Sequence, residues 1–597
     1  MINSRIAALR KKMEICNVHY VIIPTGDYHN SEYVSDFFRV REFFTGFTGS
    51  NGTLVVTREE ALLWTDGRYF IQAELELKGS EIILCKMGEE DVPTIQEYLA
   101  LNYKQDEVMG VDGRVITTSF AKKIKDAVFD ATGFYCEFND GFIPYEGIWD
   151  NQPKLPANPV FVLNGDLSGV DYKEKVLKLR KKMKALKADA IWLSKLDDIM
   201  WLFNIRGNDV ECNPVALSYC YIDEDISTLM IQKDAVTEEL SDYCEKNQIE
   251  LIDYSECDFI CSTPENKTIL IDPQYASYRH KSILEKKNTI IELPSPIIAM
   301  KAVKNPVEIS RMREVYLKDS AALTKFIYWI KNVKDKAVLN EYEVGRMVDC
   351  YRMEVDGFIE LSFPTICAYG PNGAMMHYEA TKESNSKLDN KGFLLVDSGG
   401  QYYGGTTDVT RTIVLGELTD EMKRHYTLVL KGMLNLSMVK FMYGCSGKNL
   451  DILARGPLWK EGIDYKCGTG HGVGYMLNVH EGPQSFRFKT LPGIDDSVLE
   501  EGMVITNEPG VYIEGSHGIR IENVLLCHKD IKNSDGQFMS FETLTKVPID
   551  KEAVLVDLLA KDEREFLNKY HEDVYRDISP FLSEEEKSWL RSATTPL

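Results

Sequence analysis

The arrangement of apolar and polar residues repeats within the first half of the chain. The segment 9–13 (LRKKM) recurs at 179–183, and a short apolar run follows each copy, at 20–23 and at 190–193. Around both segments apolar residues recur every three or four positions, as on one face of a helix. The matched positions are Ile6, Leu9 and Met13 in the first copy and Val176, Leu179 and Met183 in the second. The repeat predicts two related α/β domains.

Two proline-rich stretches, residues 151–159 and 293–306, separate blocks that carry clear helix and strand patterns. Because such stretches favour turns and linkers, we place domain boundaries within them. The predicted domains are residues 1–157, residues 158–303 and residues 304–597, the last with a C-terminal helical extension.

The third block opens with the signals of a long helix. Asn305 can cap the helix, Pro306 suits its first position, and Glu308 stands where a capping box needs an acidic side chain. An apolar face follows at spacings of three and four, at Ile309, Met312 and Tyr316.

Strand patterns follow this helix in the third block. Residues 392–397 and 406–415 predict an antiparallel pair joined by a glycine-rich segment. Residues 503–508 and 518–526 predict two further strands with a turn-rich connection between them. The third block is therefore expected to be of mixed α+β type.

The composition is that of a folded protein with several domains. The chain has 597 residues, of which 44% are hydrophobic and 27% are charged, so a single hydrophobic core could not serve it. A formal net charge of −23 opposes general attraction to nucleic acid or to an anionic membrane. We therefore expect neither partner, whereas a cationic peptide N-terminus suits this charge.

The cysteines and the N-terminal sequence indicate a cytoplasmic protein. The thirteen cysteines are an odd number and form no CxxC pair, which is typical of reduced thiols rather than of a disulfide framework. Residues 1–13 contain basic side chains, but no apolar signal segment follows them. No uninterrupted apolar run approaches the length of a membrane span.

Five residues of the third block have side chains suited to metal binding: Asp397, Asp408, His471, Glu508 and Glu522. Four carboxylates can neutralise two divalent cations. An oxygen-rich set with one imidazole favours manganese-like or cobalt-like ions over the ions of a thiolate site. Taken singly, an acidic residue beside a turn or on a strand edge is more often a solvated surface charge.

His471 stands in the local sequence CGTGHGVG, residues 467–474. Alternating glycines remove side chains around the imidazole and let the backbone approach closely, a clearance that a core histidine seldom needs. These glycines do not form the GxGxxG pattern of a dinucleotide-binding turn.

At these residues the chain resembles the three-domain form of the aminopeptidase P family, within the creatinase and methionine aminopeptidase superfamily. The resemblance spans essentially the whole chain, and its motifs together are highly specific. They are VDSG at 396–399, GTTDVTRT at 405–412, GTGHGVG at 468–474, NVHEGP at 478–483, NEPG at 507–510 and GIRIEN at 518–523.

The resemblance implies two related creatinase-type N-terminal α/β domains followed by a pita-bread metallopeptidase domain. It also implies two divalent metal ions, manganese above others, and a homodimer. The implied ligand set is Asp408 and Glu522 bridging both ions, Asp397 on one ion, and His471 and Glu508 on the other.

The implied activity is hydrolysis of the N-terminal Xaa-Pro bond of peptides with proline in position two, with a metal-bridging hydroxide as nucleophile. The implied catalytic residues are Glu508 as proton shuttle, His377 and His480 at the scissile carbonyl, and Arg520, with Tyr512 beside the substrate proline. Singly, each histidine is more often structural, and Tyr512 would suit core packing equally. Since Arg520 and Glu522 lie two positions apart on a predicted strand, we expect both side chains on one face.

One position departs from the family pattern. The family has a histidine four residues before the metal-binding one, where this chain has Cys467. The position lines the proline side of the pocket, so Cys467 is also counted among the substrate-binding residues. A thiol is smaller than an imidazole, neutral near pH 7 and a weak hydrogen-bond partner, so turnover or specificity is expected to differ.

Two other functions share parts of this pattern. A prolidase, which hydrolyses Xaa-Pro dipeptides, has the same five ligands but usually a single N-terminal domain, whereas this chain has the duplicated pair. A non-catalytic pita-bread binding protein has lost ligands, whereas all five remain here. The first alternative differs in substrate length, and the second in metal binding.

Overall fold

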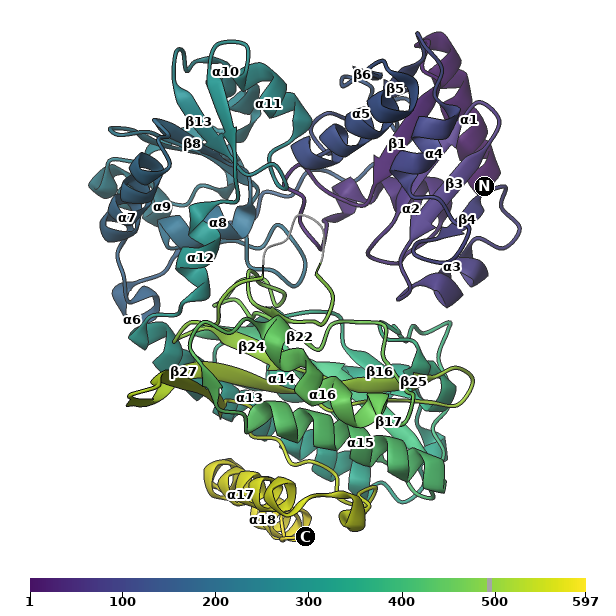
Figure 1. Ribbon diagram of the computed structural model, residues 1–597, viewed down its shortest axis with the longest axis vertical. Coiled ribbons are helices and arrows are strands. Elements are labelled where there is room, and N and C mark those ends of the chain that lie inside the picture. The colour runs from purple at the N-terminus through teal and green to yellow at the C-terminus, as the bar shows by residue number, and fades with distance from the viewer. Residues whose placement is uncertain (491–495) are drawn as a thin grey trace. The chain divides into compact units, whose positions relative to one another are not determined.

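The structure, a computed structural model, describes residues 1–490 and 496–597. The chain forms two units, and both contain helices and strands (Figure 1). Among the described residues, no helix combines the length and the apolar composition needed to cross a membrane. Unit 1 comprises Met1–Asn164 and Val170–Ile297, and unit 2 comprises Gly165–Gly169 and Ile298–Leu597.

Unit 1 contains two six-stranded sheets that share one topology. The strands of the first sheet are β1 (Tyr20–Pro24), β2 (Thr53–Thr57), β3 (Ala61–Thr65), β4 (Ile83–Lys86), β5 (Val108–Gly110) and β6 (Glu137–Asn139), and those of the second are β8 (Ala190–Leu193), β10 (Ser218–Ile222), β11 (Ser227–Ile231), β12 (Glu250–Asp253), β13 (Thr268–Ile271) and β14 (Thr289–Glu292). The strand orders are β4-β3-β2-β1-β5-β6 and β12-β11-β10-β8-β13-β14. In each sheet the first strand has one antiparallel and one parallel neighbour. The predicted pair of related α/β folds is confirmed.

Helices cover both faces of the first sheet. The helices of unit 1 are α1 (Ile2–Ile15), α2 (Val40–Thr45), α3 (Phe70–Glu76), α4 (Ile95–Asn102), α5 (Thr118–Thr132), α7 (Tyr172–Ala185), α8 (Leu196–Phe203), α9 (Glu238–Asn247), α10 (Cys257–Ser262) and α11 (Tyr278–Leu284). Because strand side chains alternate between faces, Val21 and Ile23 pack with α1, whereas Tyr20 and Ile22 pack with α5. Burial on both faces accounts for the continuous apolar run at 20–23.

Unit 2 contains the long helix that the sequence predicts, α13 (Pro306–Asn332). The Asn305 side chain accepts hydrogen bonds from the backbone N–H groups of Val307 and Glu308, at 2.9 and 3.1 Å. The Glu308 carboxylate accepts one from the Asn305 N–H at 2.9 Å. This capping box satisfies donors that the first helical turn leaves unpaired.

The strands of unit 2 agree with the sequence in part. The predicted antiparallel pair forms as β17 (Phe393–Ser398) and β20 (Val409–Val414), and β24 (Val504–Asn507) pairs with β27 (Asn523–Asn533). The prediction of one strand over 518–526 is wrong, because this segment forms two separate strands, β26 (His517–Arg520) and β27. β26 instead pairs with β25 (Gly510–Ile513), and the Glu522 N–H donates to the Thr410 carbonyl at 3.1 Å. Arg520 and Glu522 therefore do not share the face of one strand.

The C-terminal part of unit 2 completes a hydrophobic core. The remaining elements named for this unit are α14 (Glu341–Met353), α15 (Asp420–Ser437), α16 (Gly447–Trp459), α17 (Lys561–Ile578) and α18 (Glu584–Ala593), with β22 (Gly470–His471), while α12 (Pro296–Ala302) begins in unit 1 and ends in unit 2. Leu567 and Tyr570 of α17, drawn in yellow in Figure 1, belong to the same core as Val511 of β25 and Ile519 of β26. The Tyr570 hydroxyl also accepts a hydrogen bond from buried Arg411 at 2.9 Å.

His29 joins the two halves of unit 1. Its Nδ1 donates to the Ser194 carbonyl and its Nε2 accepts from the Tyr254 hydroxyl, both at 2.8 Å. The side chain is buried, and burial lowers the pKa of His29 to about 4 despite the nearby charge of Asp27. The folded state therefore holds a neutral imidazole between the two sheets.

Unit 1 should lose stability as the pH falls from about 6.5 to about 4. In that window the unfolded chain protonates His29 whereas the folded chain does not, so acid favours unfolding, by roughly 3 kcal/mol at the lower end. His29→Gln should flatten the pH dependence of the thermal unfolding temperature measured by circular dichroism. His528→Gln, in unit 2, is the control, and equal pH slopes for wild type and His29→Gln would contradict this account.

Candidate metal centre

The five residues predicted as metal ligands gather at strand ends in unit 2. Strand register explains the arrangement, because Asn507 of β24 pairs with Asn523 of β27, and Glu508 and Glu522 flank this pair. Likewise Asp397 lies opposite Thr410, two positions from Asp408. Their places are Asp397 on β17, Asp408 directly before β20, His471 at the end of β22, Glu508 directly after β24 and Glu522 between β26 and β27.

The His471 imidazole lies among the carboxylates. Its Nε2 is 3.4 Å from Asp408 Oδ2 and 3.3 Å from Glu508 Oε1. Donor atoms of Asp408, His471 and Glu522 all lie within 4.8 Å of one another. His471 Nδ1 donates to the Gly472 carbonyl at 3.0 Å, so the Nε2 side of the ring faces this cluster.

Burial and like charge shape the electrostatics of the site. Burial raises the pKa values of Asp397, Glu508 and Glu522, and the neighbouring carboxylates raise them further. Burial lowers the pKa of His471, but its hydrogen bond with Asp408 and the charge of Glu508 outweigh this and raise it to about 9. Carboxylates packed this closely therefore hold protons more tightly and attract cations.

The residues present fit divalent cations. Asp397 Oδ1 is buried and has no hydrogen-bond partner among the described residues, although an unsatisfied buried carboxylate oxygen is costly. The single imidazole and four carboxylates supply the oxygen-rich donors that hard divalent ions prefer. A pair of such ions would satisfy the unpaired oxygen and the shared negative charge together.

Arg520 and Thr410 orient these carboxylates. Arg520 forms an ion pair with Asp397 and donates to the Tyr512 hydroxyl at 2.7 Å. Its Nε donates to Thr410 Oγ1 at 3.1 Å, and Thr410 Oγ1 donates to Glu522 Oε2 at 2.8 Å. Sequence reasoning missed Thr410, although its place two residues after Asp408 on a strand was a usable signal.

The glycines beside His471 are required by close backbone contacts. A Cβ atom at Gly470 would collide with the Thr506 carbonyl oxygen, and one at Gly472 with the Glu481 carbonyl oxygen. The clearance inferred from the alternating glycines is therefore present. The absence of side chains at Gly470 and Gly472 lets the backbone on either side of His471 pack directly against neighbouring segments of the chain.

A buried cluster of charged side chains supports the segment that carries His480. The His480 and His471 ring centroids are 4.3 Å apart. Glu481, the next residue, forms ion pairs with Lys301 Nζ at 2.8 Å and with Lys304 Nζ at 2.7 Å, and all three side chains are buried. Sequence reasoning missed this cluster, whose one signal was a pair of lysines three positions apart in the apolar stretch 297–304.

The remaining predicted residues occupy different surroundings. His377 is half-buried and follows Met376, whose carbonyl accepts from Arg520 at 3.5 Å. Tyr512 and Cys467 pack against the same hydrophobic core. Burial, together with the charge of Glu508, raises the pKa of Cys467 to about 12, so the thiol is neutral.

Known protein families match almost the whole chain. Residues 310–529 match metallopeptidase family M24, and residues 537–597 match the C-terminal region of peptidase M24. The creatinase/prolidase N-terminal domain matches twice, at residues 5–137 and 151–308. The double match agrees with the two related sheets of unit 1.

Similar proteins extend over the full length. A probable Xaa-Pro aminopeptidase P from Sordaria macrospora is 38% identical over 99% of both chains, and one from Paracoccidioides brasiliensis is 36% identical over 100% of this chain and 99% of its own. The crystal structure of X-prolyl aminopeptidase from Caenorhabditis elegans, described as a cytosolic enzyme with a di-nuclear active site, covers 100% of both chains with 34% identity and a TM-score of 0.93. The prolidase from Pyrococcus horikoshii covers 63% of this chain and 99% of its own, with 26% identity and a TM-score of 0.50. The chain therefore belongs to the Xaa-Pro aminopeptidase P family of M24 metallopeptidases.

Proposed function

We propose that the protein is a metal-dependent aminopeptidase that hydrolyses the N-terminal Xaa-Pro bond of peptides. The observation that carries the proposal is the cluster of Asp408, Glu508 and Glu522 around His471, in a chain 38% identical to a probable Xaa-Pro aminopeptidase P. The C. elegans relative, similar over its whole length, is a di-nuclear enzyme. The three-part division at residues 157 and 303 belongs to the same proposal.

Two divalent ions, manganese by preference, would be held by Asp397, Asp408, His471, Glu508 and Glu522. When bound, such ions acidify water and polarise a carbonyl group. The preference for manganese rests on the donor set, which offers carboxylate oxygens and one imidazole but no thiolate.

The side chains around this centre have different roles in the reaction. Glu508 takes a proton from the attacking water and delivers it to the leaving proline nitrogen, a transfer that suits a carboxylate with a raised pKa. His377 and His480 donate hydrogen bonds to the scissile carbonyl oxygen as negative charge develops on it. The charge of Arg520 opposes the rise in the pKa of Asp397, and the ion pair holds that carboxylate where it can receive the free amine of the first residue.

Proline in position two defines the substrate. Its nitrogen carries no hydrogen and its ring fixes the backbone angle, so the pocket must fit a ring and needs no partner for an amide hydrogen. Tyr512 and Cys467 would form this side of the pocket. The neutral Cys467 thiol offers only weak hydrogen bonding there.

Chain length favours an aminopeptidase over a prolidase. The P. horikoshii prolidase covers 63% of this chain, whereas the aminopeptidase P relatives cover all of it. The additional chain supports action on peptides longer than dipeptides. The presence of all five ligand residues opposes a non-catalytic binding role.

We place the enzyme in the cytoplasm and expect a homodimer. All thirteen cysteines are free thiols, which suits a reducing compartment, and the C. elegans relative is described as cytosolic. The homodimer rests on the family resemblance alone.

Manganese should restore a defined peptide specificity to protein stripped by a chelator. We expect release of the first residue from an Xaa-Pro-Pro tripeptide, with little from an Xaa-Pro dipeptide or an Xaa-Ala-Pro control, measured by chromatography of the products. Preference for the dipeptide would identify a prolidase instead. Absence of cleavage and of bound ions would identify a binding protein.

Glu522→Gln should remove metal and activity together. Replacing an ionised ligand with an amide should lower kcat/KM by more than about 100-fold, beyond the loss typical of residues that only support a ligand. Elemental analysis should find fewer ions per chain, and Glu383→Gln, at an exposed position, is the matched control. Full activity in Glu522→Gln would exclude this carboxylate from the centre.

Thr410→Val should weaken metal binding without removing a ligand. Loss of its hydrogen bond to Glu522 frees that carboxylate, so manganese affinity should fall by about 10- to 100-fold in a titration. Thr410→Ser retains the hydroxyl and should bind nearly as wild type does. Wild-type affinity in Thr410→Val together with a loss in Thr410→Ser would show that the methyl packing, and not the hydrogen bond, matters.

A further inference from the structure

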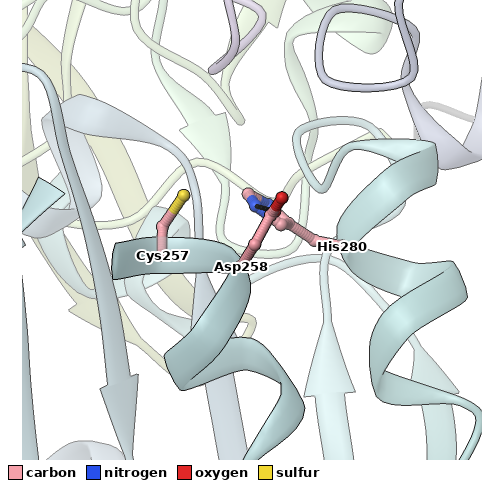
Figure 2. Close-up of side chains that lie close together, drawn as sticks. All are labelled: Cys257, Asp258 and His280. Atoms are coloured by element: carbon pink, nitrogen blue, oxygen red, sulfur yellow. Dashed lines mark ion pairs between the residues drawn. The ribbon is translucent and has the colours of Figure 1, made fainter. Parts of the chain in front are cut away.

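A second cluster of metal-binding side chains lies in unit 1, outside the proposed peptidase centre. Cys257 and Asp258 come from α10 and His280 comes from α11, and Figure 2 shows Asp258 and His280 pointing toward each other with the Cys257 sulfur beside them. A sulfur, a carboxylate oxygen and a ring nitrogen from these residues all lie within 4.8 Å of one another. None of the three is used by the proposed reaction.

His280 is buried without the hydrogen bonds that its ring needs. Its side chain is 1% exposed, and neither ring nitrogen has a hydrogen-bond partner among the described residues. Asp258 Oδ1 is likewise a buried atom without a hydrogen-bond partner among the described residues. These two groups approach to 3.3 Å but lack the alignment of a hydrogen bond. Buried polar groups in proteins are rarely left in this state.

The separation between these atoms matches that of two ligands on one ion. Bonds of about 2.0 Å in a tetrahedral site place nitrogen and oxygen ligands roughly 3.3 Å apart. At the peptidase centre, His471 Nε2 lies 3.3 and 3.4 Å from its carboxylate neighbours. The same spacing therefore occurs in two places, around two different histidines.

We propose that Cys257, Asp258 and His280 bind one zinc-type divalent cation, distinct from the ions of the peptidase centre. A thiolate, an imidazole and one carboxylate favour Zn²⁺ or Co²⁺ over Mn²⁺, Mg²⁺ or Ca²⁺. Asp258 has a side chain 37% exposed and Cys257 is half-buried, so water can reach the fourth position. The two centres would then select different metals by donor chemistry.

The surrounding charges allow this ion. Arg279 binds Asp258 Oδ2 through its Nε at 2.8 Å and a terminal nitrogen at 2.7 Å, which leaves Oδ1 directed at His280. The Cys257 thiolate and the Asp258 carboxylate would supply two negative charges, which face the two positive charges of the ion and that of Arg279. Arg279 thus orients the carboxylate, as partners of metal ligands commonly do. Without the ion, His280 has the 3.3 Å ion pair of its Nε2 with Asp258, while its Nδ1 has no hydrogen-bond partner among the described residues.

The ion would also strengthen the contact between the two halves of unit 1. It would connect α10 to α11, and the first turn of α11 is bound to the first half. There the Tyr278 N–H donates to the Ile116 carbonyl at 2.8 Å and the Arg279 N–H donates to the Gly113 carbonyl at 2.9 Å. Metal bound only by the folded state stabilises that state.

Ion counting on the full chain tests the proposal. After chelation and dialysis against Zn²⁺, elemental analysis should find one more ion per chain in wild type than in Cys257→Ser or in Asp258→Asn. Cys350→Ser, at an exposed thiol of unit 2, should match wild type. Equal counts in wild type and both cluster variants would overturn the proposal. A peptidase centre that failed to bind metal would lower all counts equally and leave the difference intact.

Cobalt gives a second readout that identifies the ligand. Co²⁺ bound to a thiolate absorbs in the near ultraviolet, and this band should be present in wild type and absent in Cys257→Ser. The Cys467→Ser variant should keep the band, since Cys467 lies by the peptidase centre. Loss of the band in Cys467→Ser and its retention in Cys257→Ser would overturn the assignment. Circular dichroism of each variant shows whether it is folded.

Discussion

The crowding of negative charge in unit 2 is the constraint on which the rest of that unit depends. Four carboxylates share a buried space with one arginine and one imidazole, and burial raises the pKa of three of them. Such an arrangement opposes folding unless positive charge accompanies it. The strands supply rigid positions, Arg520 supplies one fixed charge, and bound cations would supply the remainder. The fold thus tolerates electrostatic strain that is resolved by the proposed cofactor.

Much of the fold followed from periodic patterns. Helical spacing at Leu9 and Leu179 predicted the paired sheets, since a segment repeated with its flanking strand encodes the same local packing twice. The capping box at Asn305 predicted the start of α13 because it depends on neighbouring residues only. The break between β26 and β27 could not be predicted, because it depends on the pairing of Glu522 with the distant strand β20.

The residues of the candidate site likewise divide into those that the sequence predicted and those that it did not. Chemistry and family motifs pointed to Asp397, Asp408, His471, Glu508 and Glu522, whereas their supporting partners carry ordinary side chains. Thr410 lies two residues after Asp408, but its role depends on its bonds to Arg520 and Glu522, and the role of Glu481 depends on its two buried lysines. The Cys257 cluster likewise combines residues 257–258 with residue 280, which no sequence spacing connects. Contacts of this kind are properties of the fold, not of any single segment.

The contribution of α17 to the core has a consequence for the order of folding during synthesis. Leu567 and Tyr570 complete the core that also holds Val511 and Ile519, on the hairpin that bears Tyr512 and Arg520. A ribosome releases the chain from the N-terminus onward, so both sheets of unit 1 can form while this core is still open. The hairpin beside the proposed catalytic centre gains its final support only after residues 561–578 emerge. A nascent chain interrupted before that point would carry all five candidate ligands without the packing that holds them in register.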